Sequence, residues 1–146
     1  MKHAYINGII LDGSKEMEPQ QDKVILTDGE NIEAIVEKAQ IEDKDLTEYE
    51  ITDLAGNYIM PGLINLHLHL PATGKPKKKQ QDPVKLVKLL TSNALLRKLA
   101  LNLCASSAKT QILSGVTTIR TVGGVLDFDS KIRDQIKAGK MIGPRI

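Results

Sequence analysis

The sequence predicts an α/β protein in which a β-rich N-terminal part precedes strands that alternate with helices. Up to about residue 58, short β-branched and apolar segments are separated by turn-forming pairs such as Asn7-Gly8 and Asp28-Gly29. Further on, apolar strand-like segments alternate with segments of helical periodicity, a pattern typical of βαβ units in a parallel sheet. We therefore expect two parts, residues 1–58 and residues 59–146.

Length and composition are those of a globular protein and exclude several functions. The chain has 146 residues, of which 41% are hydrophobic and 26% charged. A net charge of +2 and 3% aromatic residues argue against nucleic-acid binding. No apolar segment reaches the ~18 residues of a membrane span, and the N-terminus lacks an apolar signal segment. We expect a cytoplasmic protein that binds neither nucleic acid nor membrane.

The N-terminal part is expected to form a small antiparallel sheet of short strands. These strands are predicted at residues 4–6, 9–11, 23–27, 32–36 and 50–54. Asn7-Gly8 should turn the first strand back, and Asp28-Gly29 should close a hairpin. The charge-rich residues 37–50 are interpreted mainly as a surface connection.

The second part should begin with a short apolar strand and continue as helix, strand, helix and the start of a third strand. The predicted ranges are residues 63–70, 84–113, 116–122, 127–138 and 144–146. Asp82-Pro83 should begin the first helical piece, Ser114-Gly115 should end the last one, and Gly139 should cap the second helix.

Three other features have an ordinary structural interpretation. Lys75 and Lys77 to Lys79 are expected to coat an exposed loop, with contact to an anionic substrate group as the alternative. Cys104 is expected to be a small buried hydrophobe; a single cysteine excludes an internal disulfide and fits a reducing compartment. His3 is interpreted as a surface histidine of the first strand.

The sharpest chemical feature is His67-Leu68-His69 at the end of the apolar strand. Strand residues i and i+2 point to the same side, so both imidazoles should project together. Two neutral imidazoles can hold Zn²⁺ or a similar divalent ion. Two histidines on a half-exposed strand without a ligand are the alternative. Pro61-Gly62 before the strand and the apolar residues around it favour the metal site.

Three segments, in order along the chain, resemble the amidohydrolase superfamily. Residues 61–69 read PGLINLHLH and are similar to its PG(L/F)ID-x-H-x-H signature. Residues 115–123 read GVTTIRTVG, similar to GVTTVRD-x-G, and residues 139–146 read GKMIGPRI, similar to G-x-I-x-GPR(I/V). The pattern is closest to the branch with imidazolonepropionase-like and prolidase-like members.

The resemblance implies a fold and a metal site. Residues 1–58 would be the N-terminal part of a composite β-sandwich, and residues 59–146 the first part of a TIM-like (β/α)₈ barrel, incomplete in this chain. His67 and His69 would be metal ligands from the first barrel strand, at the strand ends where barrel enzymes keep their active sites. The cofactor would be a divalent metal, with zinc favoured, as one or two ions in the complete enzyme.

The sequence departs from the family pattern at two positions, and it does not contain the family's metal ligands from later strands. Asn65 stands where the family often has Asp; Asn can still accept and donate hydrogen bonds, so we expect metal binding to survive. Thr121 also replaces an Asp, which leaves the substrate open. The family's other ligands, a bridging carboxylated Lys, two His and an Asp base, come from later strands. We expect no catalytic residue here beyond the metal ligands, and little activity from this chain alone.

The function implied by the resemblance is hydrolysis of an amide, dipeptide-like peptide or cyclic amide C–N bond through a metal-activated water. Deamination with one metal on the same fold is an alternative, and a non-catalytic remnant or assembly module is another. The expected partners are a small-molecule or peptide-like substrate and the remainder of the barrel, from a missing segment or a second chain. A homo-oligomer is left open.

Overall fold

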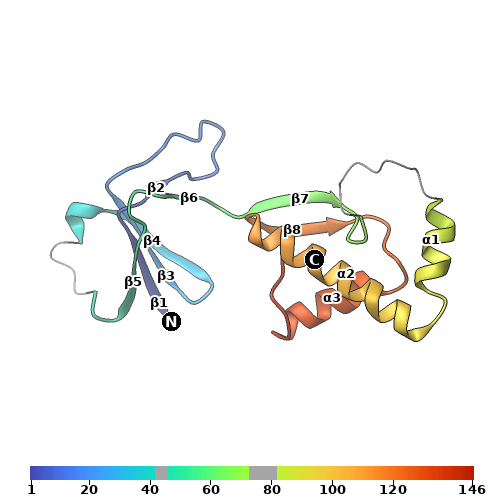
Figure 1. Cartoon of the computed structure of the whole chain (residues 1–146). Coiled ribbons are helices and arrows are strands. Elements are labelled where there is room, and N and C mark those ends of the chain that lie inside the picture. The colour runs from blue at the N-terminus through green and yellow to red at the C-terminus, as the bar shows by residue number, and fades with distance from the viewer. Residues whose placement is uncertain (42–45, 73–81) are drawn as a thin grey trace. The chain divides into compact units, whose positions relative to one another are not determined.

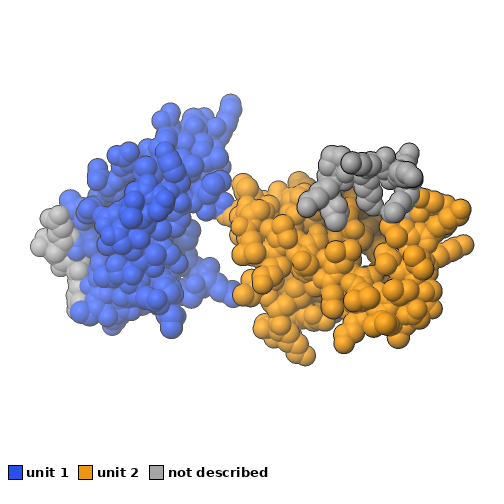
Figure 2. Space-filling view, in the orientation of Figure 1, with its two compact units in different colours: residues 1–61 blue, residues 62–146 orange. Residues whose placement is uncertain are grey.

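The computed structural model describes residues 1–41, 46–72 and 82–146. They form two compact units, Met1–Pro61 and Gly62–Ile146 (Figure 2). This division lies close to the boundary expected after residue 58, while the assignment of the parts to a composite sandwich and a barrel stays a prediction. The predicted role of Lys75 and Lys77 to Lys79 lies outside the described residues. Across the described ranges, no helix is both long and apolar enough to span a membrane.

The first unit is built on a four-stranded sheet with the strand order β4-β3-β1-β5. The strands are β1 (Lys2–Ile6), β3 (Lys23–Asp28), β4 (Asn31–Glu37) and β5 (Tyr49–Asp53), and a 3₁₀ helix η1 (Lys38–Gln40) follows β4. Ala4, Val24 and Leu26 form its buried cluster. The expected hairpin between β3 and β4 is confirmed, with Gly29 at φ +57°. The expected all-antiparallel sheet is wrong, because β1 and β5 run parallel.

The predicted return of the second strand onto the first is also wrong. The strand β2 (Ile9–Ile10) pairs in parallel with β6 (Tyr58–Ile59) in a separate two-stranded sheet. A two-residue hairpin turn of the expected type needs positive φ at both central residues. Asn7 has φ +55°, but Gly8 is not in that region. Position 8 requires a glycine for a different reason, because a Cβ there would overlap the side chain of Leu54.

The second unit follows the predicted alternation of strands and helices. It contains β7 (Leu63–Leu68), α1 (Pro83–Leu90), α2 (Ala94–Leu113), β8 (Val116–Thr121) and α3 (Phe128–Lys137). The strands β7 and β8 are parallel neighbours (Figure 1). In place of the expected third strand, Arg145 forms an isolated parallel bridge with Thr118. The Arg145 N–H donates to the carbonyl of Thr117 at 2.8 Å, and the Arg145 carbonyl accepts from Ile119 N–H at 2.8 Å. The α/β fold class is therefore confirmed.

The core of this unit lies where α2 and α3 pack against the two strands. On α2, Ala100, Cys104 and Ala108 are buried and follow one another at a spacing of four residues. Because these three side chains are small, α2 can lie close to the two strands. Ile119 of β8 and Ile132 of α3 belong to the same buried cluster. The prediction that Cys104 is a small buried hydrophobe is confirmed.

The predicted helix boundaries are confirmed at the level of single hydrogen bonds. The Asp82 side chain accepts from the N–H groups of Val84 and Lys85 at the start of α1. Asn93 caps the start of α2 in the same manner, by accepting from Leu96 N–H at 2.9 Å. Ser114 and Gly115, with φ +85°, end α2, and Gly139, with φ +68°, follows α3. The apolar periodicity of residues 84–113 thus belongs to two helices.

Apolar side chains stay exposed on surfaces of the second unit. Ile64 and Leu66 of β7 are 64% and 67% exposed. Leu95, Leu99 and Leu103 form a second, exposed row along α2. Among the described residues, β7 pairs with β8 alone, so its other edge is open. Apolar strands of parallel sheets are usually buried on both faces, so the exposure of Ile64 and Leu66 is unusual for such a strand.

Candidate metal centre

The two histidines lie at the edge of the sheet where both parallel strands end. His67 is the last residue but one of β7, and His69 follows the strand. The neighbouring strand β8 ends at Thr121, and Val122 N–H donates to the carbonyl of Leu68 at 3.0 Å. The backbone of residues 121–123 is therefore tied directly beside the histidine segment.

Alternation along the strand turns both imidazoles away from the helices. Leu70 is 1% exposed within the core cluster, and Leu68 packs against the same cluster. Because neighbouring residues of a strand point to opposite sides, His67 and His69 lie on the face opposite that core. Both side chains are exposed there. The prediction that both imidazoles project to the same side agrees with this arrangement.

A register shift precedes the first histidine. Asn65 pairs with Ile119, whereas Leu68 pairs with Thr121, so β7 holds one residue more than β8 over this stretch. An extra residue of this kind re-aims the side chains near it. It also interrupts the regular ladder, and the Asn65 Oδ1 atom accepts a hydrogen bond from the backbone N–H of His67 at 3.1 Å. The Asn that departs from the family pattern thus fixes the backbone at His67.

The two imidazoles converge through their Nε2 atoms. These atoms lie 3.3 Å apart, and the rings are inclined at 73° to each other. Two nitrogen ligands at about 2.0–2.1 Å from a tetrahedral zinc ion are separated by about 3.3–3.4 Å. The observed separation fits a shared metal ion. The same separation also fits a direct N–H···N hydrogen bond between the rings.

The second nitrogen of His69 has a protein partner of its own. Its Nδ1 atom lies 3.2 Å from the carbonyl oxygen of Gly123. Metal-binding histidines commonly use their other ring nitrogen in this way, which fixes the ring and its tautomer. Gly123 is a site residue that sequence reasoning missed. The Gly123-Gly124 pair was visible only as the end of a strand, and no sequence signal indicates where a backbone carbonyl will point.

His67 and His69 are the two candidate metal ligands, and the described residues bring no third candidate to them. No group of three or more His, Cys, Asp or Glu side chains that could hold a metal occurs among the described residues. His3 belongs to the first unit, where its Nδ1 atom lies 3.5 Å from the carboxylate of Glu50. Burial raises the pKa of the Cys104 thiol to about 11, with the nearby Asp129 adding to the effect. A neutral, buried thiol is a poor ligand.

Thr121, the second departure from the family pattern, lies on the edge of a hollow beside α3. Asp129 lines the same hollow, and one of its carboxylate oxygens, Oδ1, is buried without a hydrogen-bond partner. The other oxygen lies close to Gly124, where a Cβ would approach it to 2.7 Å. Asp129 therefore packs against the loop that carries the Gly123 carbonyl, a contact that the sequence did not indicate.

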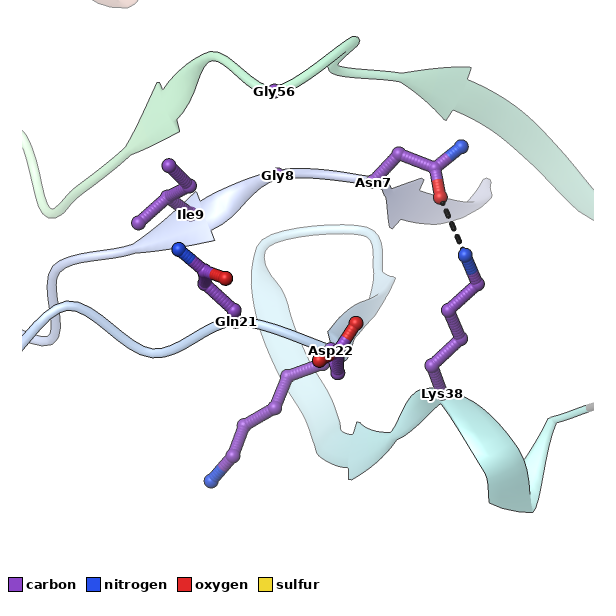
Figure 3. A pocket seen from close by; sticks show the side chains of 8 residues that line it. Asn7, Gly8, Ile9, Gln21, Asp22, Lys38 and Gly56 are labelled. Atoms are coloured by element: carbon purple, nitrogen blue, oxygen red, sulfur yellow. Dashed lines mark hydrogen bonds between the residues drawn. The ribbon is translucent and has the colours of Figure 1, made fainter.

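A hollow in the first unit is lined partly by polar residues, and two of them, Lys38 and Asn7, are hydrogen-bonded to each other. Figure 3 shows the Lys38 ammonium donating to the Asn7 side chain, at a distance of 2.9 Å. The Asn7 amide donates in turn to the Asp53 carboxylate at 3.0 Å. The pKa of Asp53 is lowered, first by the Ala55 N–H and then by Asn7. This hollow has no histidine in its lining and does not compete with the His67–His69 pair.

No family model matches the sequence, and a search of curated proteins gives no match. Solved structures do match. A Bifidobacterium longum protein provisionally assigned as a prolidase is 30% identical over 99% of this chain, with a TM-score of 0.70. A Xaa-Pro dipeptidase with methionine bound in its active site is 27% identical over 100% of this chain, with a TM-score of 0.73. Guanine deaminase from E. coli shares the fold, at 16% identity over 97% of this chain and a TM-score of 0.72.

These comparisons confirm the resemblance to the amidohydrolase superfamily that the three sequence motifs indicated. The chain has the α/β fold of an N-terminal part of such proteins. It covers 29%, 32% and 34% of the three structures described above, and so spans about 30% of their length.

Proposed function

We propose that the chain is the N-terminal part of a metal-dependent hydrolase that cleaves a carbon–nitrogen bond in a peptide-like substrate. One observation carries this proposal. His67 and His69 lie at the carboxyl edge of two parallel strands with their Nε2 atoms 3.3 Å apart. That edge is where barrel enzymes keep their active sites.

In this proposal His67 and His69 hold one divalent metal ion, with zinc favoured over other ions. The bound metal would lower the pKa of a water molecule toward about 7 and polarise the scissile carbonyl group. The chain's own residues position the ligands. Asn65 fixes the backbone at His67, and Gly123 accepts from the ring of His69. A catalytic zinc site has about three protein ligands, so further ligands must come from beyond the described residues.

A dipeptide-like substrate is favoured because the prolidase-like protein and the Xaa-Pro dipeptidase are 30% and 27% identical to this chain. A deaminase reaction is the second candidate, supported by the shared fold of guanine deaminase at 16% identity. The identities favour hydrolysis of a peptide or related amide.

The surfaces of the second unit support a proposal about partners. The open edge of β7 and the exposed row on α2 would be covered by further polypeptide that completes the barrel, with a homo-oligomer as the alternative. A lone buried cysteine supports a reducing, cytoplasmic setting.

The experiment is made on the full-length protein, with His67 and His69 changed to Ala singly and together. We expect each change to abolish metal content and the zinc-dependent release of amino acids from Xaa-Pro dipeptides. His3→Ala is the matched control, because His3 is a histidine of the other unit, and it should retain both properties. Full metal content in the double variant would contradict the ligand assignment. Release of ammonia from guanine without dipeptide cleavage would support the deaminase alternative.

A further inference from the structure

We infer that Gly123 is a positioning residue, whose backbone carbonyl holds His69 in the tautomer with a proton on Nδ1 and an unprotonated Nε2 atom, whose lone pair faces His67. The use of that lone pair for a metal rests on the proposed function. The tautomer itself does not, and it can be measured in the metal-free protein.

The hydrogen bond defines the tautomer. The His69 Nδ1 atom lies 3.2 Å from the Gly123 oxygen, and a carbonyl oxygen can only accept. The proton of this bond must therefore belong to Nδ1. A neutral imidazole carries one such proton, so the Nε2 atom of His69 is left as an acceptor. It is this Nε2 atom that faces the Nε2 atom of His67.

The surrounding contacts place the carbonyl where His69 can reach it. Val122 N–H donates to the carbonyl of Leu68, which joins the residue before Gly123 to the residue before His69. On the other side, the Asp129 carboxylate packs against Gly124 so closely that a Cβ at Gly124 would come within 2.7 Å of it. The loop is thus held from the strand side and from the first turn of α3.

A glycine is required at position 123 by the backbone and not by lack of space. Gly123 has φ +72°, in the left-handed region that side chains rarely adopt. A Cβ there would lie 3.8 Å from the His69 ring, an ordinary van der Waals distance. Gly123→Ala should therefore act by turning the peptide and its carbonyl away from His69. Asn adopts the left-handed region more readily, so Gly123→Asn should preserve the carbonyl.

Gly139 provides a matched control for the strain itself. It also has a positive φ, of +68°, and a Cβ there meets nothing within 4 Å. It follows the C-terminal end of α3, whereas Gly123 and Gly124 precede that helix. Gly139→Ala should produce a similar backbone penalty without affecting the tautomer.

The test is long-range ¹H–¹⁵N correlation NMR of the metal-free chain with labelled histidine, at about pH 9, where an ordinary imidazole is neutral. In the wild-type chain, Gly123→Asn and Gly139→Ala, we expect the His69 Nδ1 atom to be protonated and its Nε2 atom to be unprotonated. In Gly123→Ala we expect the Nε2-protonated form to gain population. In the same variant, zinc affinity should fall by about 10- to 100-fold, as it does on loss of other groups that orient ligands.

Two results would overturn the inference. One is an Nε2-protonated His69 in the wild-type chain. The other is a folded Gly123→Ala chain that retains the Nδ1 tautomer. If Gly123→Ala does not fold, the wild-type chain and Gly123→Asn decide the question, because both must show the Nδ1 tautomer. If His69 shows the expected tautomer but the chain does not bind zinc, the proposed metal site is refuted and the role of Gly123 is not. Zinc binding through His67 and His69 with the other tautomer would refute only the role of Gly123.

Discussion

The Oδ1 atom of Asn65 accepts a hydrogen bond from the backbone N–H of His67 at 3.1 Å. This bond lies within the stretch where β7 holds one residue more than β8. A side chain therefore supplies the acceptor at a point where the ladder of the sheet is interrupted. The geometry of the first histidine depends on a residue that differs from the family pattern.

Changing Asn65 to Ala should lower the free energy of unfolding by about 1 kcal/mol, because the N–H of His67 loses its acceptor. Asn65→Asp should stay within about 0.5 kcal/mol of the wild-type value, since a carboxylate oxygen can accept the same bond. Urea denaturation of the three chains measures these differences. Equal losses of stability in both variants would contradict the hydrogen bond from His67 N–H to the side chain at position 65 as the cause.

A side chain at Gly62 should destabilise the chain while Thr117 is present. A Cβ on Gly62 would overlap the Thr117 side chain across the β7–β8 pair. We expect Gly62→Ala to cost about 1–3 kcal/mol of stability through this overlap. Thr117→Gly removes the opposing atoms and should recover part of the loss in the double variant. A double-mutant cycle by denaturation measures the coupling, and simple additivity would contradict the proposed contact.

Cys104 should make the second unit less stable at high pH. Burial, aided by Asp129, raises its thiol pKa from 9.0 to about 11. Below pH 9 the thiol is protonated in both the folded and the unfolded state, so the free energy of unfolding has its full value there. As the pH rises from about 9 to about 11, the unfolded state loses its proton first, so roughly 2 kcal/mol of stability is lost.

The measurement compares unfolding of the wild-type chain and Cys104→Ala between pH 8 and pH 11. Stability of the wild-type chain should fall relative to the variant over this range. Labelling offers a second check: iodoacetamide should react slowly with Cys104 in the folded chain and rapidly in urea, because the side chain is 1% exposed. Rapid labelling of the folded chain would contradict the buried environment.

Local signals in the sequence predicted most elements of the second unit. Asp82, Ser114-Gly115 and Gly139 act at the ends of helices through bonds within a few residues, and such bonds can be read from spacing. The HxH pattern likewise predicted that both imidazoles project together, because alternation is a property of the strand itself. Whether they bind metal stays a prediction.

The sequence could not predict features that depend on distant partners. Asn7-Gly8 resembles a hairpin turn, but Gly8 is needed where Leu54 packs against it. The parallel pairing of β1 with β5 joins segments more than forty residues apart, by a register that no local pattern encodes. The contact between His69 and Gly123 spans 54 positions and uses a backbone carbonyl, which every residue has.

The most direct test of the central claim is zinc titration of the chain, followed through the ¹⁵N signals of its histidine rings. If one ion is shared by His67 and His69, their Nε2 signals should shift together along one binding curve, while the signals of His3 stay unchanged. A response of only one of the two rings, or of His3 to the same extent, would contradict the shared site.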